Sequence, residues 1–396
     1  MSIRVLSLNV WGLPFGLARA VPERMARIGA ELPVLEPDLV AFQEVWTHAA
    51  RRALIEAGQR SGHVHGWYVQ RRLMNGGLLV LSRWPISEAR FTRFSLGGWP
   101  HRIDHADYYG GKGLAALRIE TPDGAIALLV THLQADYVPS EHADPYLPTR
   151  VAQVVELATI ARASRLPTIA VGDFNADEDG LAHRLLRVLT GWSDVAIALD
   201  RRLATCLAPH PYRSARARPR RIDHVFVSNG PGPRPVPLAL RRVLDAELEI
   251  DGALGAYSDH AGLLAELALR EEASAEGADP ARADTPASAA APAPSDEAEV
   301  VLARAAETLR AGRETAAAQQ RNARIVSAAG ALTVGGGLGA ARRPGRDRRA
   351  FLHAAGLAAV GAGLGLGLSA GWLAERFGRA ELRAFVAAEA ELEALR

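Results

Sequence analysis

The sequence contains a single cysteine, Cys206, among 396 residues. No disulfide can form within the chain, and the cysteine content leaves the redox compartment open. A lone cysteine is more often a small core residue than a nucleophile, so we expect Cys206 in the core. Paired cysteines, which a structural zinc site uses, are also missing.

A large excess of one charge is missing as well. The formal net charge is +2, from 46 basic and 44 acidic side chains, so no overall basic field recruits nucleic acid. Apolar residues make up 48% and charged residues 23%, which is ordinary for a globular protein. The length exceeds that of one typical core, and we therefore expect two or more parts.

The first residues lack the features of a secretory signal. Residues 2–10 have no long apolar stretch and no small-residue cleavage site, and they predict a β-strand. We therefore expect this part of the chain to stay in the cytoplasm.

Apolar runs of strand length recur as far as residue 268. Helical spacing occurs between some of them, as in Val151, Val154, Val155 and Ala158 after Pro148. Strands mixed with helices predict a layered α/β domain over residues 1–268. The clearest runs are 38–42, 77–81, 125–130, 167–171, 222–227 and 261–267.

The composition changes after residue 268. Residues 269–296 are rich in Ala, Pro, Ser, Asp and Glu and predict a disordered linker. Residues 297–396 predict a helical region that begins with a helix over 297–322.

The helical region contains two apolar segments. Residues 351–374 carry no charge over 24 positions, and a bilayer-crossing helix needs about 20 residues. Residues 325–341 form a weaker segment of Ala and Gly. We expect membrane attachment through 351–374; the alternative is a buried pair of Ala/Gly helices. Basic residues 342–349 prefer the cytoplasmic side, which fits one span from a cytoplasmic domain and does not fit a two-span hairpin.

Polar residues stand at the ends of the predicted strands, where a sheet edge meets solvent. Each alone also fits a turn, a helix cap or a core histidine. Together they indicate a functional site. They are Asn9, Glu44, His132, Asp173, Asn175, Asp223, Asp259 and His260.

The residue types in this set indicate the chemistry. Carboxylate and amide oxygens without paired cysteines suit a hard ion, Mg²⁺ or Mn²⁺. Histidines transfer protons near neutral pH. A hard cation with an acid/base pair is what hydrolysis of a phosphodiester requires.

The blocks around these residues resemble the endonuclease/exonuclease/phosphatase superfamily, and all of them occur in order over about residues 1–268. The resemblance implies a four-layer sandwich, in which two mixed β-sheets lie between layers of helices. The blocks are Leu8-Asn9-Val10, Gln43-Glu44, Thr131-His132-Leu133, Gly172-Asp173-Phe174-Asn175, Arg221-Ile222-Asp223 and Ser258-Asp259-His260.

Within the superfamily, the chain is similar to neutral sphingomyelinases. The similarity lies in residues 9–14, 43–46, 131–135 and 150–153. It implies a sphingomyelinase-like hydrolase that acts on a phospholipid or sphingolipid headgroup, for example sphingomyelin to ceramide and phosphocholine. The apolar C-terminal region fits the membrane-bound members loosely.

The loop over residues 105–113 is similar to one in which an Asp and a Lys five positions apart regulate access. Asp107 and Lys112 occupy these positions; the alternative is a solvated glycine turn. Trp11 stands where DNA-repair members have an Asp, which argues against a nuclease. The basic stretch 213–221 is a solvated loop or contacts anionic headgroups or a phosphate backbone.

The resemblance implies a role for each residue. Glu44 binds the metal with support from Asn9, and Asp259 supports the metal or His260. Asp173 and Asn175 position the phosphate and the water. His260 is the general base, Asp223 orients it, and His132 stabilises the phosphoryl oxygens or protonates the leaving alkoxide. The rivals are a nuclease or phosphoinositide phosphatase on the same fold, and a membrane scaffold without catalysis.

Overall fold

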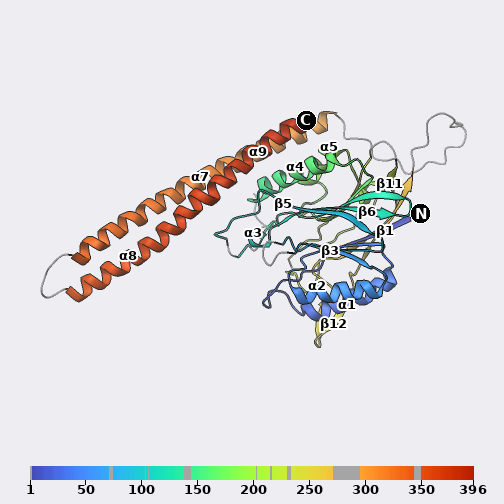
Figure 1. Ribbon diagram of the computed structural model, residues 1–396, viewed down its shortest axis with the longest axis horizontal. Helices are drawn as coiled ribbons and strands as arrows, with labels where there is room; N and C mark the ends of the chain where they lie inside the picture. Colours follow the sequence, from blue (N-terminus) through green and yellow to red (C-terminus); the bar gives the residue numbers. More distant parts are fainter. Residues whose placement is uncertain are drawn as a thin grey trace, which may run out of the picture. The chain divides into compact units, whose positions relative to one another are not determined.

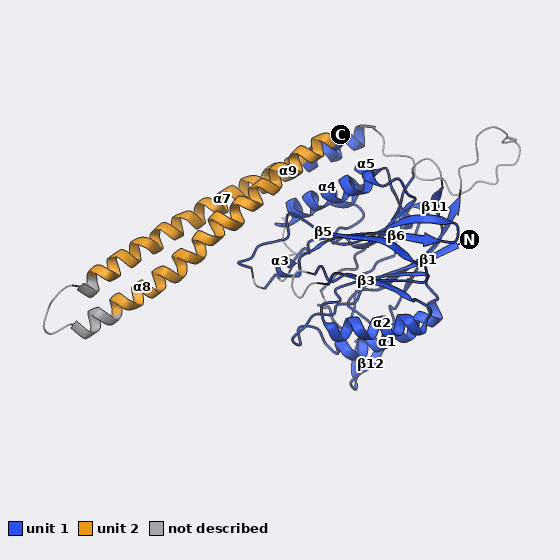
Figure 2. Ribbon diagram, viewed as in Figure 1, with its two compact units in different colours: residues 1–305, 395–396 blue, residues 306–394 orange. Residues whose placement is uncertain are grey.

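The computed structural model describes residues 2–70, 75–102, 104–105, 107–137, 144–201, 203–214, 216–229, 233–270, 295–342 and 349–396. The chain divides into two compact units, residues 1–305 with 395–396, and residues 306–394 (Figure 2). Most of the expected linker, residues 271–294, lies outside the described residues, as do 343–348 of the expected basic segment.

The first sheet has the strand order β11-β14-β1-β2-β4-β3. β1 pairs parallel with β2 and antiparallel with β14, so the first and last strands of this sheet in sequence are neighbours. Its strands are β1 (Ser2–Asn9), β2 (Leu39–Gln43), β3 (His65–Tyr68), β4 (Leu79–Ser82), β11 (Arg234–Val243) and β14 (Gly262–Arg270).

The second sheet has the order β5-β6-β7-β8-β10-β9. β7 and β8 are parallel and the other pairs are antiparallel, so both sheets are mixed. Its strands are β5 (Ile86–Arg93), β6 (Gly113–Thr121), β7 (Gly124–His132), β8 (Thr168–Asp173), β9 (Ser193–Asp194) and β10 (Asp223–Val227). A separate hairpin consists of β12 (Glu247–Ile250) and β13 (Ala253–Ala256).

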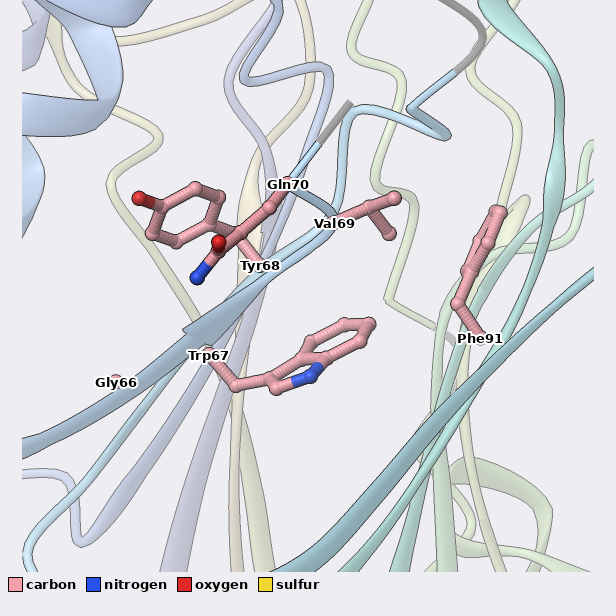
Figure 3. Close-up of a pocket in the computed structure, with 6 residues that line it drawn as sticks. All are labelled: Gly66, Trp67, Tyr68, Val69, Gln70 and Phe91. Carbon is pink, nitrogen blue, oxygen red and sulfur yellow. The ribbon is translucent and has the colours of Figure 1, made fainter. Parts of the chain in front are cut away.

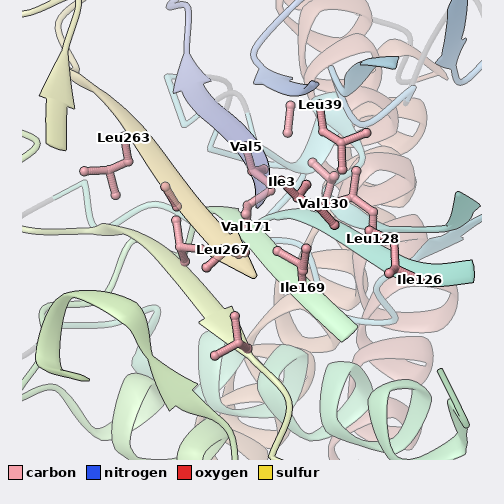
Figure 4. Close-up of a cluster of buried hydrophobic side chains, with 14 of the residues drawn as sticks. Ile3, Val5, Leu39, Ile126, Leu128, Val130, Ile169, Val171, Leu263 and Leu267 are labelled. Carbon is pink, nitrogen blue, oxygen red and sulfur yellow. The ribbon is translucent and has the colours of Figure 1, made fainter. Parts of the chain in front are cut away.

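The main core lies between the two sheets. Alternate residues of β1 and β2, such as Val5 and Leu39, face Leu128 and Val171 of the second sheet (Figure 4). The residues between them, such as Leu6, face the helices outside the first sheet. Strands buried on both faces appear in the sequence as unbroken apolar runs, which is why they could be predicted.

Helices cover the outer face of each sheet (Figure 1). The helices α1 (Val21–Leu35) and α2 (His48–Arg60) pack on the first sheet. On the outer face of the second sheet lie α4 (Leu147–Ala163) and α5 (Leu181–Thr190). The short α6 (Val195–Ala198) packs Val195 and Ala196 into the core between the sheets, and the short α3 (Asp107–Gly110) precedes β6. The predicted four-layer sandwich of two mixed sheets flanked by helices is confirmed. Helix α4 begins at Leu147, with Pro148 in the first turn, where its missing N–H costs nothing.

The second unit is a helical hairpin. Helix α7 (Ser295–Arg342) lies beside α8 (Arg349–Trp372), a π-helical turn η1 (Leu373–Gly378) and α9 (Arg379–Leu395) (Figure 1). The helix predicted over 297–322 is the first half of α7, and the apolar segment 325–341 is its second half. Pairing with α8 accounts for the longer helix, because tertiary packing overrides the low helix propensity of glycine.

Glycines let the two helices of the hairpin approach closely. A Cβ built on Gly363 would meet Gly330 O at 2.6 Å, and Ser327 Oγ donates to Gly367 O at 2.9 Å. Farther along, Gln320 Nε2 donates to Ala374 O at 2.9 Å. The two apolar segments therefore pack against each other over their length.

Candidate functional site

The sheet pairing gathers the predicted polar residues. Asn9 ends β1, opposite Gln43 in β2, and Glu44 follows directly. In the second sheet, His132 is paired with Asp173, and Asp173 with Asp223. Both sheets therefore contribute carboxylates, an amide and an imidazole to one site.

Asn9 joins the two sheets at this site. Its Nδ2 donates to Glu44 Oε1 and to Asp173 Oδ2, both at 3.0 Å. Its Oδ1 accepts a hydrogen bond from Trp11 N at 3.0 Å, which fixes the orientation of the amide. Both amide hydrogens therefore face carboxylates of different sheets.

His260 and Asp223 form a buried pair. His260 Nδ1 lies 2.8 Å from Asp223 Oδ2, and Nε2 lies 3.9 Å from Asp173 Oδ2. Burial disfavours a charged ring, but Cys206, Asp223 and other acidic groups outweigh it and raise the pKa of His260 well above its ordinary value. The ring is thus oriented by Asp223 and presents Nε2 to the centre of the site.

Asp259 lies beside this pair. Its Oδ1 is 3.4 Å from Ser258 Oγ, which also lies 2.6 Å from Asn9 O, and its negative charge contributes to the raised pKa of His260. Ser258 therefore ties the end of β1 to the loop that carries Asp259 and His260.

His132 lies between the carboxylates and Lys112. Its Nε2 is 3.3 Å from Asp173 Oδ2 and 3.9 Å from Glu44 Oε1. Lys112 Nζ lies 2.5 Å from the same Nε2, 3.0 Å from Asp107 Oδ1 and 3.3 Å from Leu133 O. Lys112 is the only lysine in the sequence, and its side chain is 1% exposed. The 105–113 loop thus supplies a buried ammonium to the site.

Asn175 closes the site above Asp173. Its N–H donates to Asp173 Oδ1 at 2.9 Å and its Nδ2 to Leu133 O at 3.0 Å, with φ at 49°. The left-handed conformation is uncommon except for Asn and Gly. Burial would raise the pKa of Asp173, but His132, His260 and Lys112 lower it well below its ordinary value. Asp173 is therefore a carboxylate surrounded by donors.

The donor set fits a hard divalent cation. Asp173, Asp223 and His260 each offer a ligand atom within 4.8 Å of the others, and all three are buried. Among the described residues, Glu44 Oε2 and Asp223 Oδ1 are buried and have no hydrogen-bond partner. A buried carboxylate oxygen without a partner is costly, so a cation would satisfy an existing deficit. Glu44 also has a positive φ of 60°, a strained conformation that aims its side chain.

Two residues of α4 hold the loop that follows His132. Gln153 Oε1 accepts from Gln134 N at 2.9 Å, and Arg150 NH1 donates to Gln134 O at 3.1 Å. Burial lowers the pKa of Arg150 to about 10. These contacts explain the similarity noted over residues 150–153: the helix fixes the strand end that carries His132.

One positioning residue has no signal in the sequence. Arg24 of α1 is fully buried and donates to Val10 O, Trp11 O and Tyr257 O at 2.7, 2.7 and 3.1 Å. It connects the loop after Asn9 with the loop before Asp259. An arginine in an amphipathic helix is normally solvent-exposed, and only the tertiary structure identifies this one as buried.

The basic stretch 213–221 divides into two parts. Arg216 and Arg218 are exposed, as expected of a solvated loop. Arg220 donates to Asp177 Oδ2 at 3.0 Å, and Arg221 is buried and bonded to Asp194. Arg221 therefore belongs to the protein interior, whereas Arg220 is half-buried and held by Asp177.

An apolar hollow of about 330 Å³ lies between β3 and β5, the edge strands of the two sheets (Figure 3). None of the candidate site residues lines it, so it is separate from the site. Its lining residues are Gly66, Trp67, Tyr68, Val69, Gln70 and Phe91.

Comparison with known proteins gives a family match, two similar relatives and a similar solved structure. The profile of the Endonuclease/Exonuclease/phosphatase family matches residues 6–260. A Drosophila melanogaster protein with the provisional name neutral sphingomyelinase is 32% identical over 277 residues, which are 68% of this chain and 61% of that protein. An inositol phosphosphingolipids phospholipase C of Schizosaccharomyces pombe is 32% identical over 191 residues, 46% of this chain and 43% of the other.

The chain thus spans less than two thirds of the length of either relative. Among solved structures, sphingomyelinase C from Streptomyces griseocarneus superimposes with a TM-score of 0.50 at 19% sequence identity, and the match covers 67% of this chain and 99% of that one. At this identity the likeness concerns the fold.

Proposed function

We propose a function from the premise that this chain belongs to the endonuclease/exonuclease/phosphatase family. The chain is a metal-dependent phosphodiesterase that hydrolyses the headgroup phosphodiester of a phospholipid or sphingolipid. One observation carries the proposal: the Asp223-oriented His260 faces a carboxylate, Asp173, that Asn9 joins to Glu44. A base and a candidate metal ligand therefore meet at one point.

Glu44, with Asn9 beside it, is the proposed metal-binding group, and Asp259 is a supporting ligand. Mg²⁺ is the proposed ion and Mn²⁺ the alternative, because the donors are oxygen atoms. When bound, the ion neutralises phosphoryl charge and orients the phosphate.

His260 takes the proton from the attacking water, which requires a neutral ring. A bound cation would offset the negative charges that raise the pKa of His260 and would favour that neutral form. Asp223 holds Nδ1 at 2.8 Å, so Nε2 is the nitrogen left to accept the proton. Asp173 and Asn175 position the water and the phosphate from the adjacent strand end. Asp223 then stabilises the charge that forms on the ring.

His132 and Lys112 act on the opposite side of Asp173. His132 stabilises the phosphoryl oxygens or protonates the leaving alkoxide, and the buried ammonium of Lys112 adds positive charge beside it. Lys112 also contacts Asp107, and we propose that this pair governs when the ammonium is free to serve the substrate.

The names of the relatives support a sphingolipid substrate. We propose the hydrolysis of sphingomyelin to ceramide and phosphocholine, or of a related sphingolipid. Trp11 also favours a lipid over DNA as the substrate, because its indole stands two positions after Asn9, where DNA-repair members of the family have a carboxylate. Its ring packs on Tyr212, with centroids 5.0 Å apart, and Arg24 lies 5.1 Å from its centroid.

The C-terminal unit is the proposed membrane anchor. Ala355–Leu395 is long and apolar enough to cross a membrane by length and composition. Leu357, Leu366 and Leu368 are 63–70% exposed, and Leu332 on α7 is 78% exposed, so both helices present leucines outward. Such a surface is expected against lipid.

We propose that the catalytic unit faces the cytoplasm. Arginines flank the two apolar segments at one end of the hairpin. Arg321 and Arg324 of α7 precede the first segment, and Arg376 and Arg379 follow the second. Basic flanking residues favour the cytoplasmic side. By the same rule, the arginines of residues 342–349, between the two apolar segments, favour the reverse orientation of a two-span hairpin, and the following experiment separates the two. Protease digestion of intact inverted vesicles should release the catalytic unit, and protection in these vesicles with release in right-side-out vesicles would reverse the orientation.

Assay of the purified full chain on three substrates tests the activity. We expect hydrolysis of sphingomyelin or a lysophospholipid in mixed micelles with Mg²⁺, loss with EDTA and recovery on adding Mg²⁺. Activity on abasic DNA alone would establish the rival nuclease. Release of inorganic phosphate from a phosphoinositide would establish the rival phosphatase. If no substrate is hydrolysed, the non-catalytic membrane scaffold is the remaining hypothesis.

A further inference from the structure

A second cluster of potential metal ligands lies one residue away from the site. His183 of α5, Asp194 of β9 and His224 of β10 offer ligand atoms within 4.8 Å of one another, and all are buried. His224 directly follows Asp223 in β10, and successive strand residues point to opposite faces. The cluster is therefore behind the proposed catalytic residues.

Arg221 fills this cluster. Its NH1 donates to Asp194 Oδ2 and His224 Nδ1, both at 2.8 Å, and its NH2 and Nε donate to Glu178 Oε2 at 2.5 and 3.0 Å. A guanidinium has only donors and keeps its charge in proteins. The positive charge between these ligands is thus already supplied, and a metal ion would have to displace it.

The guanidinium also sets which ring nitrogen of His224 carries the hydrogen. Because Arg221 only donates, His224 Nδ1 must accept, and the ring hydrogen is on Nε2, which donates to Ala176 O at 2.7 Å. His183 Nε2 donates to Asp194 Oδ2 at 2.7 Å. Burial lowers the pKa of His183 to about 4, although Asp194 favours its charged form. Both rings serve as hydrogen-bonding groups around one ion pair.

The network holds the loop after β8. His224 binds Ala176 O, and Arg221 binds the side chain of Glu178. Asn175 lies directly before these two anchors, with its N–H on Asp173 Oδ1. β10 carries His224 and begins with Asp223, the partner of His260, two residues after Arg221. The same network therefore fixes Asn175 and Asp223 relative to each other.

We propose that Arg221 is a positioning residue of the phosphodiesterase site, which sets Asn175 relative to Asp223 through Glu178 and His224. The inference rests on the proposed function. It assigns a task to a cluster that, by its ligand types alone, has the composition of a metal site. Glu178, Asp194, His183 and His224 are the parts through which Arg221 acts.

A double-mutant cycle with Asn175 tests the proposal, since coupled residues give non-additive effects. In the otherwise wild-type chain, Arg221→Lys should lower kcat about 10- to 100-fold with KM changed less than about threefold, the range for residues that orient a site's ligands. In an Asn175→Ala background the same change should cost less than about threefold. The matched control is Arg118→Lys, which makes the same substitution at an exposed ion pair with Glu120. It should leave kcat unchanged in both the wild-type and the Asn175→Ala background.

Several outcomes would overturn the proposal. An equal fold-loss in both backgrounds would show that Arg221 does not act through Asn175. His224→Leu removes the bond to Ala176 O without removing a charge, and it serves if Arg221→Lys does not fold. A folded His224→Leu with unchanged kcat would exclude the network from positioning.

Cobalt binding provides a check that does not use activity. Titration with Co²⁺, followed by its d–d absorption, should give the same number of equivalents for the wild type and His183→Gln. Loss of one equivalent in His183→Gln would make the cluster a metal site and overturn the role of Arg221. An inactive wild type would instead defeat the proposed function, so the two failures are distinguishable.

Discussion

Asn9 and Asp173 belong to different sheets, and a hydrogen bond of 3.0 Å joins them at the centre of the site. Asn9 donates equally to Glu44, so one amide group lies between two carboxylates. This arrangement satisfies two acceptors with one neutral side chain and adds no negative charge. A substitution of Asn9 should therefore change both the stability of the fold and the binding of a metal ion.

Asn9→Asp should destabilise the metal-free protein by about 1–3 kcal/mol, because a third carboxylate replaces the shared donor. Mg²⁺ should then raise the thermal midpoint of the variant more than that of the wild type, since bound cation offsets the added repulsion. Calorimetry of both proteins with EDTA and with Mg²⁺ measures this. An equal Mg²⁺ shift in the two proteins would contradict a metal at Asn9.

His260→Ala should lower kcat by about 10²–10⁴-fold, the usual contribution of a general base. Metal binding should be unchanged, because the proposed ligands Glu44, Asn9 and Asp259 remain in place. Loss of Mg²⁺ binding would instead make His260 a metal ligand together with Asp173 and Asp223. Isothermal titration with Mg²⁺ and initial rates on mixed micelles check the two expectations. His48→Ala, at an exposed histidine, is the control. Retained turnover would remove His260 from its proposed role.

The sequence predicted the parts of the fold and site that depend on local pattern. β1, β2, β7 and β8 are apolar runs because both faces are buried, and Asn9, Glu44, His132 and Asp173 stand where these runs end. Strands such as β3 and β5 are partly exposed edge strands, so their sequences contain no unbroken apolar run that would predict a strand. Their pairing is set by neighbours distant in the sequence.

The contacts of buried cations could not be predicted. Arg24 and Arg221 occur in segments whose composition is that of a solvated helix face or loop, and tertiary packing alone places them inside. For Lys112, the resemblance indicated a regulatory loop, while its 2.5 Å approach to His132 depends on how β6 and β7 pair. Long-range pairing is the information that one sequence does not display.

Lys112→Arg should lower kcat by about 10- to 100-fold although the charge is kept. The ammonium bonds to Asp107, His132 and Leu133 O in a space with 1% exposure, and a planar guanidinium cannot direct donors at the same three atoms. Initial rates of Lys112→Arg and Lys112→Gln measure this, with circular dichroism to confirm folding. If Lys112→Arg retains wild-type activity, charge alone is sufficient and the geometric argument fails.

His183 should make the folded state sensitive to mild acid. Its pKa of about 4 lies below the ordinary 6.5, so between these values the unfolded chain binds a proton that the folded chain does not. Stability is therefore complete above pH 6.5 and falls by up to roughly 3 kcal/mol as the pH drops to about 4.

Urea unfolding at several pH values, compared for wild type and His183→Gln, measures this slope. The variant should show a shallower loss between pH 6.5 and 4. His48→Gln, at an exposed position, should retain the wild-type slope. Parallel curves for wild type and His183→Gln would show that other groups cause the acid sensitivity.

The helical hairpin should form a disulfide between introduced cysteines while bound to lipid. A Cβ on Gly371 would lie 3.9 Å from Ser327 Cβ, within the range for a disulfide, and the native Cys206 is buried in the catalytic unit. Ser327→Cys with Gly371→Cys should therefore cross-link in protein that floats with liposomes, as detected by fragment mobility after proteolysis without reductant.

Two glycines provide matched tests of the pairing. Gly363→Leu should lower the cross-linking yield several-fold, because its side chain would run into Gly330 O, whereas a Cβ on Gly361 meets nothing within 4 Å and Gly361→Leu should leave the yield unchanged. Both changes add the same apolar side chain to α8, so membrane affinity shifts equally and only helix packing differs. Efficient cross-linking of Gly363→Leu, or none in any liposome-bound variant, would show that α7 and α8 are not paired in the bilayer.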